Sequence, residues 1–125
     1  MKGLNKVMLI GNVGADPEMR YTPTGLPVVR LSLATTKTWN DDSGEKKSKT
    51  EWHRITAWRK TAEIVNEYVH KGSPLFVEGH LEYGQYEKDG ITHYTTNVVA
   101  ENVILLSSRP TEETEAAPDE EIVFS

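Results

Sequence analysis

The chain has no cysteine, which excludes disulfide bonds and metal sites built on thiolate ligands. It also has no apolar run close to the roughly 20 residues that a membrane-spanning helix needs. The opening Met1–Lys6 lacks the long hydrophobic stretch of a secretory signal peptide. We therefore expect a protein that stays in the cytoplasm and has no membrane partner.

Lysine and arginine are absent from residues 110–125, whereas residues 1–109 carry all 14 basic residues of the chain. The formal net charge of −5 is therefore an average over two unlike regions, a nearly neutral body and an acidic end. A neutral body binds a polyanion only where its cations gather on one face. The acidic end cannot bury enough apolar area to offset its ordering entropy. We predict one folded domain, 1–109, and a disordered acidic tail, 110–125.

Apolar residues that alternate with polar ones predict strands over most of the body. The first expected strand is an apolar run without helical spacing, typical of a strand buried on both faces. The expected strands are 5–13, 28–38, 50–58, 75–81 and 92–106. Turn residues separate them: 16–17 and 21–25 favour turns, 40–48 a long hairpin tip and 88–90 a tight hairpin.

One segment changes to helical periodicity. Ala62, Val65 and Val69 fall on one face of a helix over 61–71, and Gly72 supplies a stop signal. The order of elements is then three strands, one helix and two strands. This order predicts an all-β fold with one helix, a five-stranded OB-fold barrel whose helix lies between the third and fourth strands. The exposed sheet face of such barrels binds oligonucleotides.

Residues 50–58 are the most informative segment. In a strand, Trp52, Arg54 and Trp58 point to one face, and small or aliphatic side chains point to the other. Two indoles and a guanidinium in one row suit a ligand with flat rings and phosphates. The alternative places the tryptophans in the core, where most tryptophans lie. That alternative would also bury Arg54 without a partner, which is costly, so the exposed arrangement is favoured.

The two predicted hairpins carry further aromatic and basic side chains. Trp39 stands beside the 40–48 hairpin, where solubility explains lysines but not a large aromatic residue. The lysines of this region are Lys37, Lys46, Lys47 and Lys49. Tyr83, Tyr86 and Tyr94 surround the second hairpin turn. Cross-strand packing and contact with a ligand explain these tyrosines equally well.

Catalytic and metal-binding patterns are not found in the sequence. The glycines of Gly11–Gly14 lack the lysine and hydroxyl of a phosphate-binding loop. The histidines have no metal-ligand spacing, and no serine has the context of a nucleophile elbow. Glu78 and His80 share a strand face, where a surface pair is the simpler interpretation. We predict no enzyme activity, no metal and no cofactor.

Residues 4–106 contain short motifs that resemble those of bacterial single-stranded-DNA-binding proteins, in the same order and at the same spacing. The matching segments are Asn5–Val7, Ile10–Asn12, Asp16–Glu18, Thr50–Arg54, Val77–Gly79 and Tyr94–Thr96. The resemblance implies an OB-fold, a homotetramer and sequence-independent binding of single-stranded DNA during replication, recombination and repair, at the nucleoid of the cytoplasm. It implies stacking of bases on Trp39, Trp52 and Trp58, and on Tyr86, where the family usually has tryptophan.

Together, the residues and the resemblance define the candidate sites. The candidate DNA-binding residues are Trp39, Trp52, Arg54, Trp58, Tyr86, Lys37, Lys47 and Lys49. In the family, an acidic tip with a hydrophobic pair recruits replication and repair proteins. The corresponding partner-binding residues here are Asp119, Glu120, Glu121, Ile122, Val123 and Phe124. Val123 replaces the usual proline and Ser125 follows the phenylalanine, so a partner that grips the terminal carboxylate would lose its register.

The first strand also bears on assembly. Val7 and Leu9 point to one side of it, and Met8 and Ile10 point to the other. A barrel wall has one interior, so the outer pair needs another cover, which subunit pairing would supply. His53 matches a family position associated with subunit contacts, which leaves open whether it lies inside the barrel or at an interface.

Two other classes of protein are alternatives to a single-stranded-DNA-binding protein. An OB-fold module that binds RNA or a protein partner would keep the barrel, but it need not keep three tryptophans. An OB-fold enzyme would need a catalytic constellation, and the sequence provides none.

Overall fold

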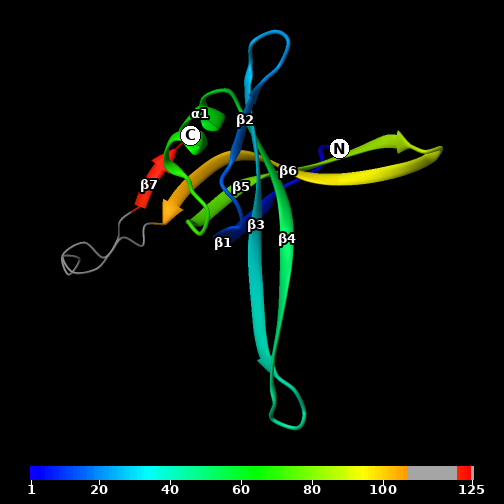
Figure 1. The fold of residues 1–125 in the computed structure, drawn as a ribbon. Coiled ribbons are helices and arrows are strands. Elements are labelled where there is room, and N and C mark those ends of the chain that lie inside the picture. The colour runs from blue at the N-terminus through cyan, green and yellow to red at the C-terminus, as the bar shows by residue number, and fades with distance from the viewer. Residues whose placement is uncertain (107–120, 125) are drawn as a thin grey trace.

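A computed structural model describes residues 1–106 and 121–124 (Figure 1). It consists of strands and one helix, followed after a gap by a short last strand. In chain order the elements are β1 (Val7–Val13), β2 (Glu18–Tyr21), β3 (Pro27–Asn40), β4 (Lys46–Trp58), α1 (Arg59–Tyr68), β5 (Pro74–Lys88), β6 (Ile91–Leu106) and β7 (Glu121–Phe124).

Five of the strands close into a barrel. The sheet runs in the order β1-β5-β6-β4-β3-β2, and a second pairing of β1 with β3, at Val13 and Leu33, closes the barrel and leaves β2 at its edge. Every pairing is antiparallel except the short one between β4 and β6, where Ile55 faces Val98. The helix lies between β4 and β5 in the chain. This architecture confirms the predicted OB-fold barrel.

Side-chain alternation fills the barrel with aliphatic residues. On β3, Val29, Leu31 and Leu33 are buried while the residues between them are exposed or half-buried. The helix adds Ala62 and Val65 to the same core. The remaining buried hydrophobic residues are Val13, Ile55, Ala57, Val69, Leu75, Val77, Val98, Ala100 and Val103. No polar side chain is buried among the described residues, so the interior holds no candidate site.

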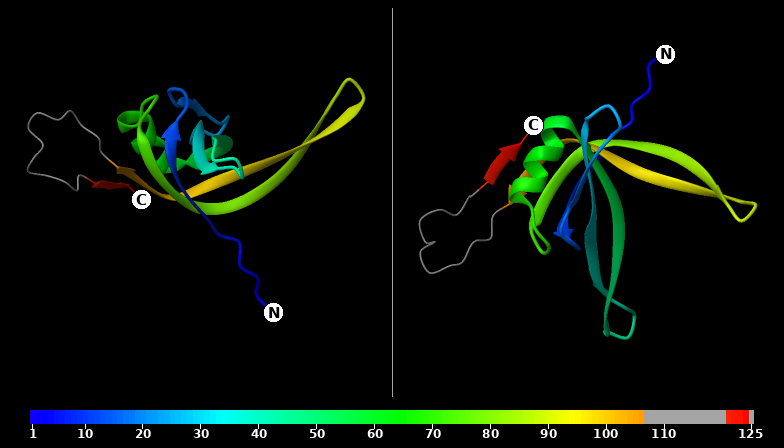
Figure 2. Two further views of the ribbon diagram at one scale, coloured as in Figure 1. Left: turned by 90° about the horizontal axis from the view of Figure 1, so that it is seen from below. Right: turned by 45° about the horizontal axis from the view of Figure 1, so that its top comes forward.

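Two hairpins project from the barrel in different directions (Figures 1 and 2). We call them the β3–β4 arm, residues 36–51, and the β5–β6 arm, residues 82–97. The β5–β6 arm turns at Asp89 and Gly90, whose φ angles of 54° and 77° are those of a type I′ turn, as the Asp-Gly pair predicted. Both faces of each arm lie outside the barrel. On the arms, side chains that continue the inward-facing parity of the barrel strands are therefore not buried.

Several elements differ from the sequence-based expectation. Strand β2 was not predicted, because residues 16–25 carry turn signals on both sides of a four-residue strand. The helix ends at Tyr68 instead of residue 71, because Val69 is extended and buried in the core. Strand β1 is covered on one face only, since the side chains of Met8 and Ile10 are 61% and 64% exposed in the single chain.

The described part of the tail is strand β7, which was not predicted. It pairs antiparallel with β6 from Val103↔Phe124 to Leu106↔Glu121, on the stretch of β6 that continues past β4. Figure 2 shows β7 near α1, on the side of the barrel away from the tip of the β5–β6 arm. Residues 110–120, with Asp119 and Glu120, lie outside the described residues. Within the described residues, no helix has the length and apolar character needed to cross a bilayer.

Candidate nucleic-acid interface

Trp52, Arg54 and Trp58 form a row on the outer face of β4, as the sequence predicted. Their neighbours Ile55 and Ala57 are buried in the barrel, which fixes the parity of the strand. Trp52 and Trp58 are 61% and 40% exposed. Exposed indole rings without a structural role in the core are available to stack on flat ligands. We call these three residues the outer row.

A groove of about 590 Å³ runs beside the outer row, between the β3–β4 sheet and the β5–β6 arm. Arg54 and Tyr86 line it together with Arg30, which lies next to Thr56 across the β3–β4 pairing. Among the described contacts, neither guanidinium has a hydrogen bond or ion pair. Two arginines without partners in one groove suit an anionic backbone. The remaining lining residues are Ala15, Asp16, Glu18, Leu31, Ile55, Thr56, Thr95 and Asn97.

Arg30 is a groove residue that the list of candidates missed. The sequence could have indicated its outward position, because Arg30 alternates with buried Val29 and Leu31 just as Arg54 alternates with buried Ile55. Two acidic residues, Asp16 and Glu18, line the same groove. The groove is therefore close to electrically balanced, which limits how much attraction to phosphate its charge provides.

Trp39 lies on the opposite face of the β3–β4 arm from the outer row. Its cross-strand partner is Lys47, and Lys37 pairs with Lys49, whereas the face of Trp52 holds Ala34 and Thr50. Trp39 is 43% exposed because the arm extends beyond the core. A second groove, of about 620 Å³, lies on this side and is lined by Trp39, Lys37, Lys49, Thr35, Thr36 and Glu51. The candidate DNA-binding residues are thus divided between two faces of one hairpin.

Two of the four hairpin lysines, Lys47 and Lys49, already have acidic neighbours. Lys47 lies 3.6 Å from Glu45 and 3.9 Å from Asp41, and Lys49 lies 3.4 Å from Glu51. Backbone and side-chain hydrogen bonds from Ser43 and Glu45 lower the pKa of Asp41, the Ser43 hydroxyl having the largest effect. Exposed pairs of this kind contribute little to stability. A phosphate can therefore replace these carboxylates at small cost.

Tyr86 stacks on His93 across the β5–β6 arm, with ring centroids 5.0 Å apart and an interplanar angle of 16°. Its face of the arm is the one that lines the groove. Tyr83 and Tyr94 have the opposite parity and lie on the reverse face. The structure therefore separates Tyr86, which the sequence analysis had selected, from the other two tyrosines.

Gly14 sets the position of the Trp52 ring. The amide of Gly14 donates a hydrogen bond to the carbonyl of Ser32 at 3.0 Å, which holds the backbone against β3. A Cβ atom at position 14 would clash with Cζ3 of Trp52 and would lie 2.8 Å from Oγ of Ser32. Glycine at this position therefore leaves the space into which the indole packs.

The remaining points from the sequence concern His53 and metal binding. His53 is half-buried and pairs with buried Leu33 across the β3–β4 ladder, and its Nε2 atom is 2.9 Å from Oγ1 of Thr35. Its predicted subunit contact stays a prediction. Among the described residues, no group of three potential ligands is arranged to hold a metal ion.

Comparison with known proteins supports a common ancestry over the whole barrel. Residues 4–106 match the model of the family described as "Single-strand binding protein family". Two proteins named "Single-stranded DNA-binding protein", from Neisseria meningitidis and Xanthomonas campestris, are 45% and 44% identical over 119 and 109 residues. The alignments cover 94% and 86% of this chain, but 68% and 63% of those proteins. A relative from Xylella fastidiosa, "Single-stranded DNA-binding protein 1", is 47% identical over 87% of this chain and 82% of its own length.

Two solved structures share the architecture. The one described as "Plasmodium falciparum SSB complex with ssDNA" has a TM-score of 0.79 and 33% identity, over 86% of this chain and 98% of that one. A deletion mutant of the single-stranded DNA binding protein from Thermus aquaticus has a TM-score of 0.69 and 40% identity, over 82% and 57% of the two chains. With the family match over the barrel, these likenesses show that the chain belongs to the single-strand binding protein family.

Proposed function

We propose that the protein binds and protects single-stranded DNA without sequence preference and has no catalytic activity. The observation that supports this most strongly is the outer row, where two exposed indoles flank an unpaired arginine beside a groove. Bases unstacked from a duplex offer a flat face to each ring, and this contact does not depend on base identity. The relatives named for single-stranded DNA share this barrel, which supports the same ligand here.

Stacking is proposed to contribute more to affinity than charge. The body is nearly neutral, two of its four hairpin lysines are paired with acids, and its groove contains two carboxylates beside its two arginines. Long-range attraction to phosphate is weak for such a surface. The aromatic contacts are short-range and are not screened by salt.

A titration with homopolymers tests the ligand. Poly-dT should quench tryptophan fluorescence strongly, because the outer row and Trp39 account for all three tryptophans of the chain. The alternative is an OB-fold module for RNA or a protein partner. If poly-rU quenches at lower concentration than poly-dT, or if neither polymer binds, the proposal for DNA is wrong.

Self-association is proposed as part of the same function, with a homotetramer as the assembled form. Met8 and Ile10 form an exposed apolar pair on the outer face of β1, which a second copy of the chain would cover. Sedimentation velocity at micromolar concentration is the direct measurement. A monomer under those conditions would contradict the proposal, while Met8→Lys should shift an assembled protein toward smaller species.

The tail is proposed to recruit proteins of DNA replication, recombination and repair at the nucleoid. Its acidic residues precede Ile122 and Phe124, a combination that fits an apolar pocket rimmed by basic residues. Deletion of residues 110–125 should abolish such recruitment and leave the oligomer intact. A truncated protein that still captured those partners normally would refute the recruiting role.

A further inference from the structure

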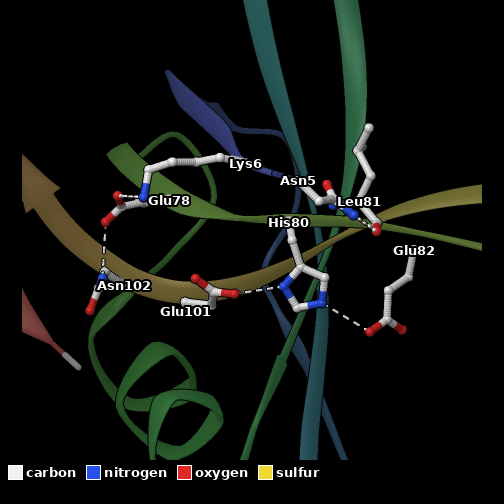
Figure 3. Close-up of polar contacts among 8 residues, drawn as sticks. All are labelled: Asn5, Lys6, Glu78, His80, Leu81, Glu82, Glu101 and Asn102. Atoms are coloured by element: carbon white, nitrogen blue, oxygen red, sulfur yellow. Dashed lines mark hydrogen bonds and ion pairs between the residues drawn. The ribbon is translucent and has the colours of Figure 1, made fainter. Parts of the chain in front are cut away.

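His80 is held between two carboxylates on the outer face of β5 (Figure 3). Its Nδ1 atom lies 2.6 Å from an oxygen of Glu101, and its Nε2 atom lies 3.0 Å from an oxygen of Glu82. The side chain of His80 is 28% exposed, and those of both acids are more exposed. We call these three residues the His80 clasp.

A β-bulge brings Glu101 into the clasp. Glu78 pairs with Asn102 and Gly79 pairs with Ala100, so Glu101 is the extra residue of β6 at this point. A bulge places two successive side chains on the same face of a sheet. Glu101 and Asn102 therefore both face outward, where Glu101 contacts His80 and Asn102 donates a hydrogen bond to Glu78 at 2.9 Å.

The geometry of the clasp fits a protonated ring. A carboxylate only accepts hydrogen bonds, so both ring nitrogens of His80 must donate to satisfy both acids. A neutral imidazole has one donor, and its other nitrogen would direct a lone pair at a carboxylate. The hydrogen bonds to Glu82 and then to Glu101 raise the pKa of His80 above its ordinary value of 6.5.

The clasp shares its face with the apolar pair of β1. Met8 pairs with Glu78 across the β1–β5 ladder, and directly paired residues lie on the same face of a sheet. Glu78 and His80 are two positions apart on β5 and share that face as well. Lys6 closes the group with an ion pair to Glu78, shown in Figure 3. Apolar side chains and charges of both signs therefore lie together on one surface.

The charged groups that face the clasp come from three elements. The segment before β1 contributes Lys6, β5 contributes Glu78 and Glu82, and β6 contributes Glu101. The residues of β1 itself are all uncharged. With His80 protonated, this group has a formal charge of −1, and with His80 neutral the charge is −2.

We propose that the His80 clasp makes self-association through this face depend on pH, with the protonated clasp favouring association with a second copy of the chain. This inference rests on the proposed self-association through β1. In a two-fold interface the patch meets its own copy, so each group of net negative charge faces another. Proton loss from His80 increases that repulsion and leaves an unsatisfied carboxylate in a contact that excludes water. Lys6 of one copy can approach Glu82 or Glu101 of the other, which gives the surface its self-complementarity.

The direction of the effect follows from the protonation state. Below the raised pKa the clasp is charged and association is strongest. As the pH rises through that pKa, above 6.5, the proton is lost and association weakens. We expect the dissociation constant of the assembly to increase about five- to tenfold across this titration. Added salt should reduce the change, because exposed charges are screened.

Analytical ultracentrifugation of the full chain from about pH 5.5 to about pH 8.5, at constant ionic strength, measures this dependence. The test variant is His80→Gln, which keeps a hydrogen-bonding side chain without a titrating group. The matched control is His70→Gln, an exposed histidine between α1 and β5 and outside the patch. The control should retain the pH dependence, and His80→Gln should lose it.

The outcomes separate the two proposals. A monomer at every pH would overturn the proposed self-association and this inference with it. An assembly whose dissociation constant is the same at every pH would overturn this inference alone. A His80→Gln protein that retains the full dependence would also overturn it, because another group would then carry the effect.

Discussion

Replacing Trp52 with alanine tests the proposed stacking mechanism most directly. Trp52 is 61% exposed and its ring packs against Gly14, so its removal takes little surface from the core. We expect the free energy of unfolding to change by less than about 1 kcal/mol. Loss of one stacked base should weaken binding of single-stranded DNA by about 1–3 kcal/mol, which is about 5- to 150-fold in Kd.

The measurement is a titration of Trp52→Ala with fluorescently labelled oligo-dT, by anisotropy. Trp52→Phe keeps a smaller aromatic face and should recover most of the affinity. Ile91→Ala is the matched control, because Ile91 is 60% exposed but offers no ring for stacking. Equal affinities for Trp52→Ala and the parent chain, with both folded, would refute the stacking role of the outer row. A comparable loss in Ile91→Ala would attribute the effect to apolar area in general.

Three further predictions concern positioning, salt and the tail. Gly14→Ala should displace the Trp52 indole and weaken DNA binding without unfolding the protein, and an unchanged affinity would show that the ring position is unimportant. The logarithm of the DNA-binding constant should fall by about 0.7 per log unit of salt concentration for each phosphate neutralised, and binding should persist at high salt. Complete loss of binding at moderate salt would mean that charge, and not stacking, dominates. Deletion of residues 110–125 should tighten DNA binding at low salt, because six acids no longer compete with phosphate, and the gain should fade as salt is added.

Much of the barrel could be predicted from the sequence because its strands obey a period of two. Residues such as Leu31 and Ile55 alternate with polar neighbours, and the predicted turns fall between these strands. Strand β2 has four residues and one half-buried side chain, so alternation gives no signal there. Strand β7 forms because β6 continues past β4 and leaves an unpaired edge, and this relationship is not visible in either segment alone.

The candidate site was predictable where a strand forms the barrel wall and less so beyond it. Alternation correctly placed the outer row, because Ile55 and Ala57 anchor the opposite face in the core. It also gives Trp39 the parity of Val29 and Leu33, opposite to the outer row, but it could not show that this face is exposed on the arm, because both faces of the arm lie outside the barrel. The His80 clasp depended on the bulge at Glu101, which shifts the register of β6 by one residue.

The two surfaces proposed here for DNA and for a second copy belong to one outer layer of the barrel. Asn97 lines the groove beside the outer row, and its cross-strand partner is Glu82, which is part of the His80 clasp. The clasp therefore lies at the boundary between the groove and the exposed face of β1. The phosphates of a bound strand and a second copy would both bring negative charge to this boundary, so we expect protonation of His80 to favour both contacts. The β5 and β6 strands are thus the elements through which DNA binding and assembly can influence each other.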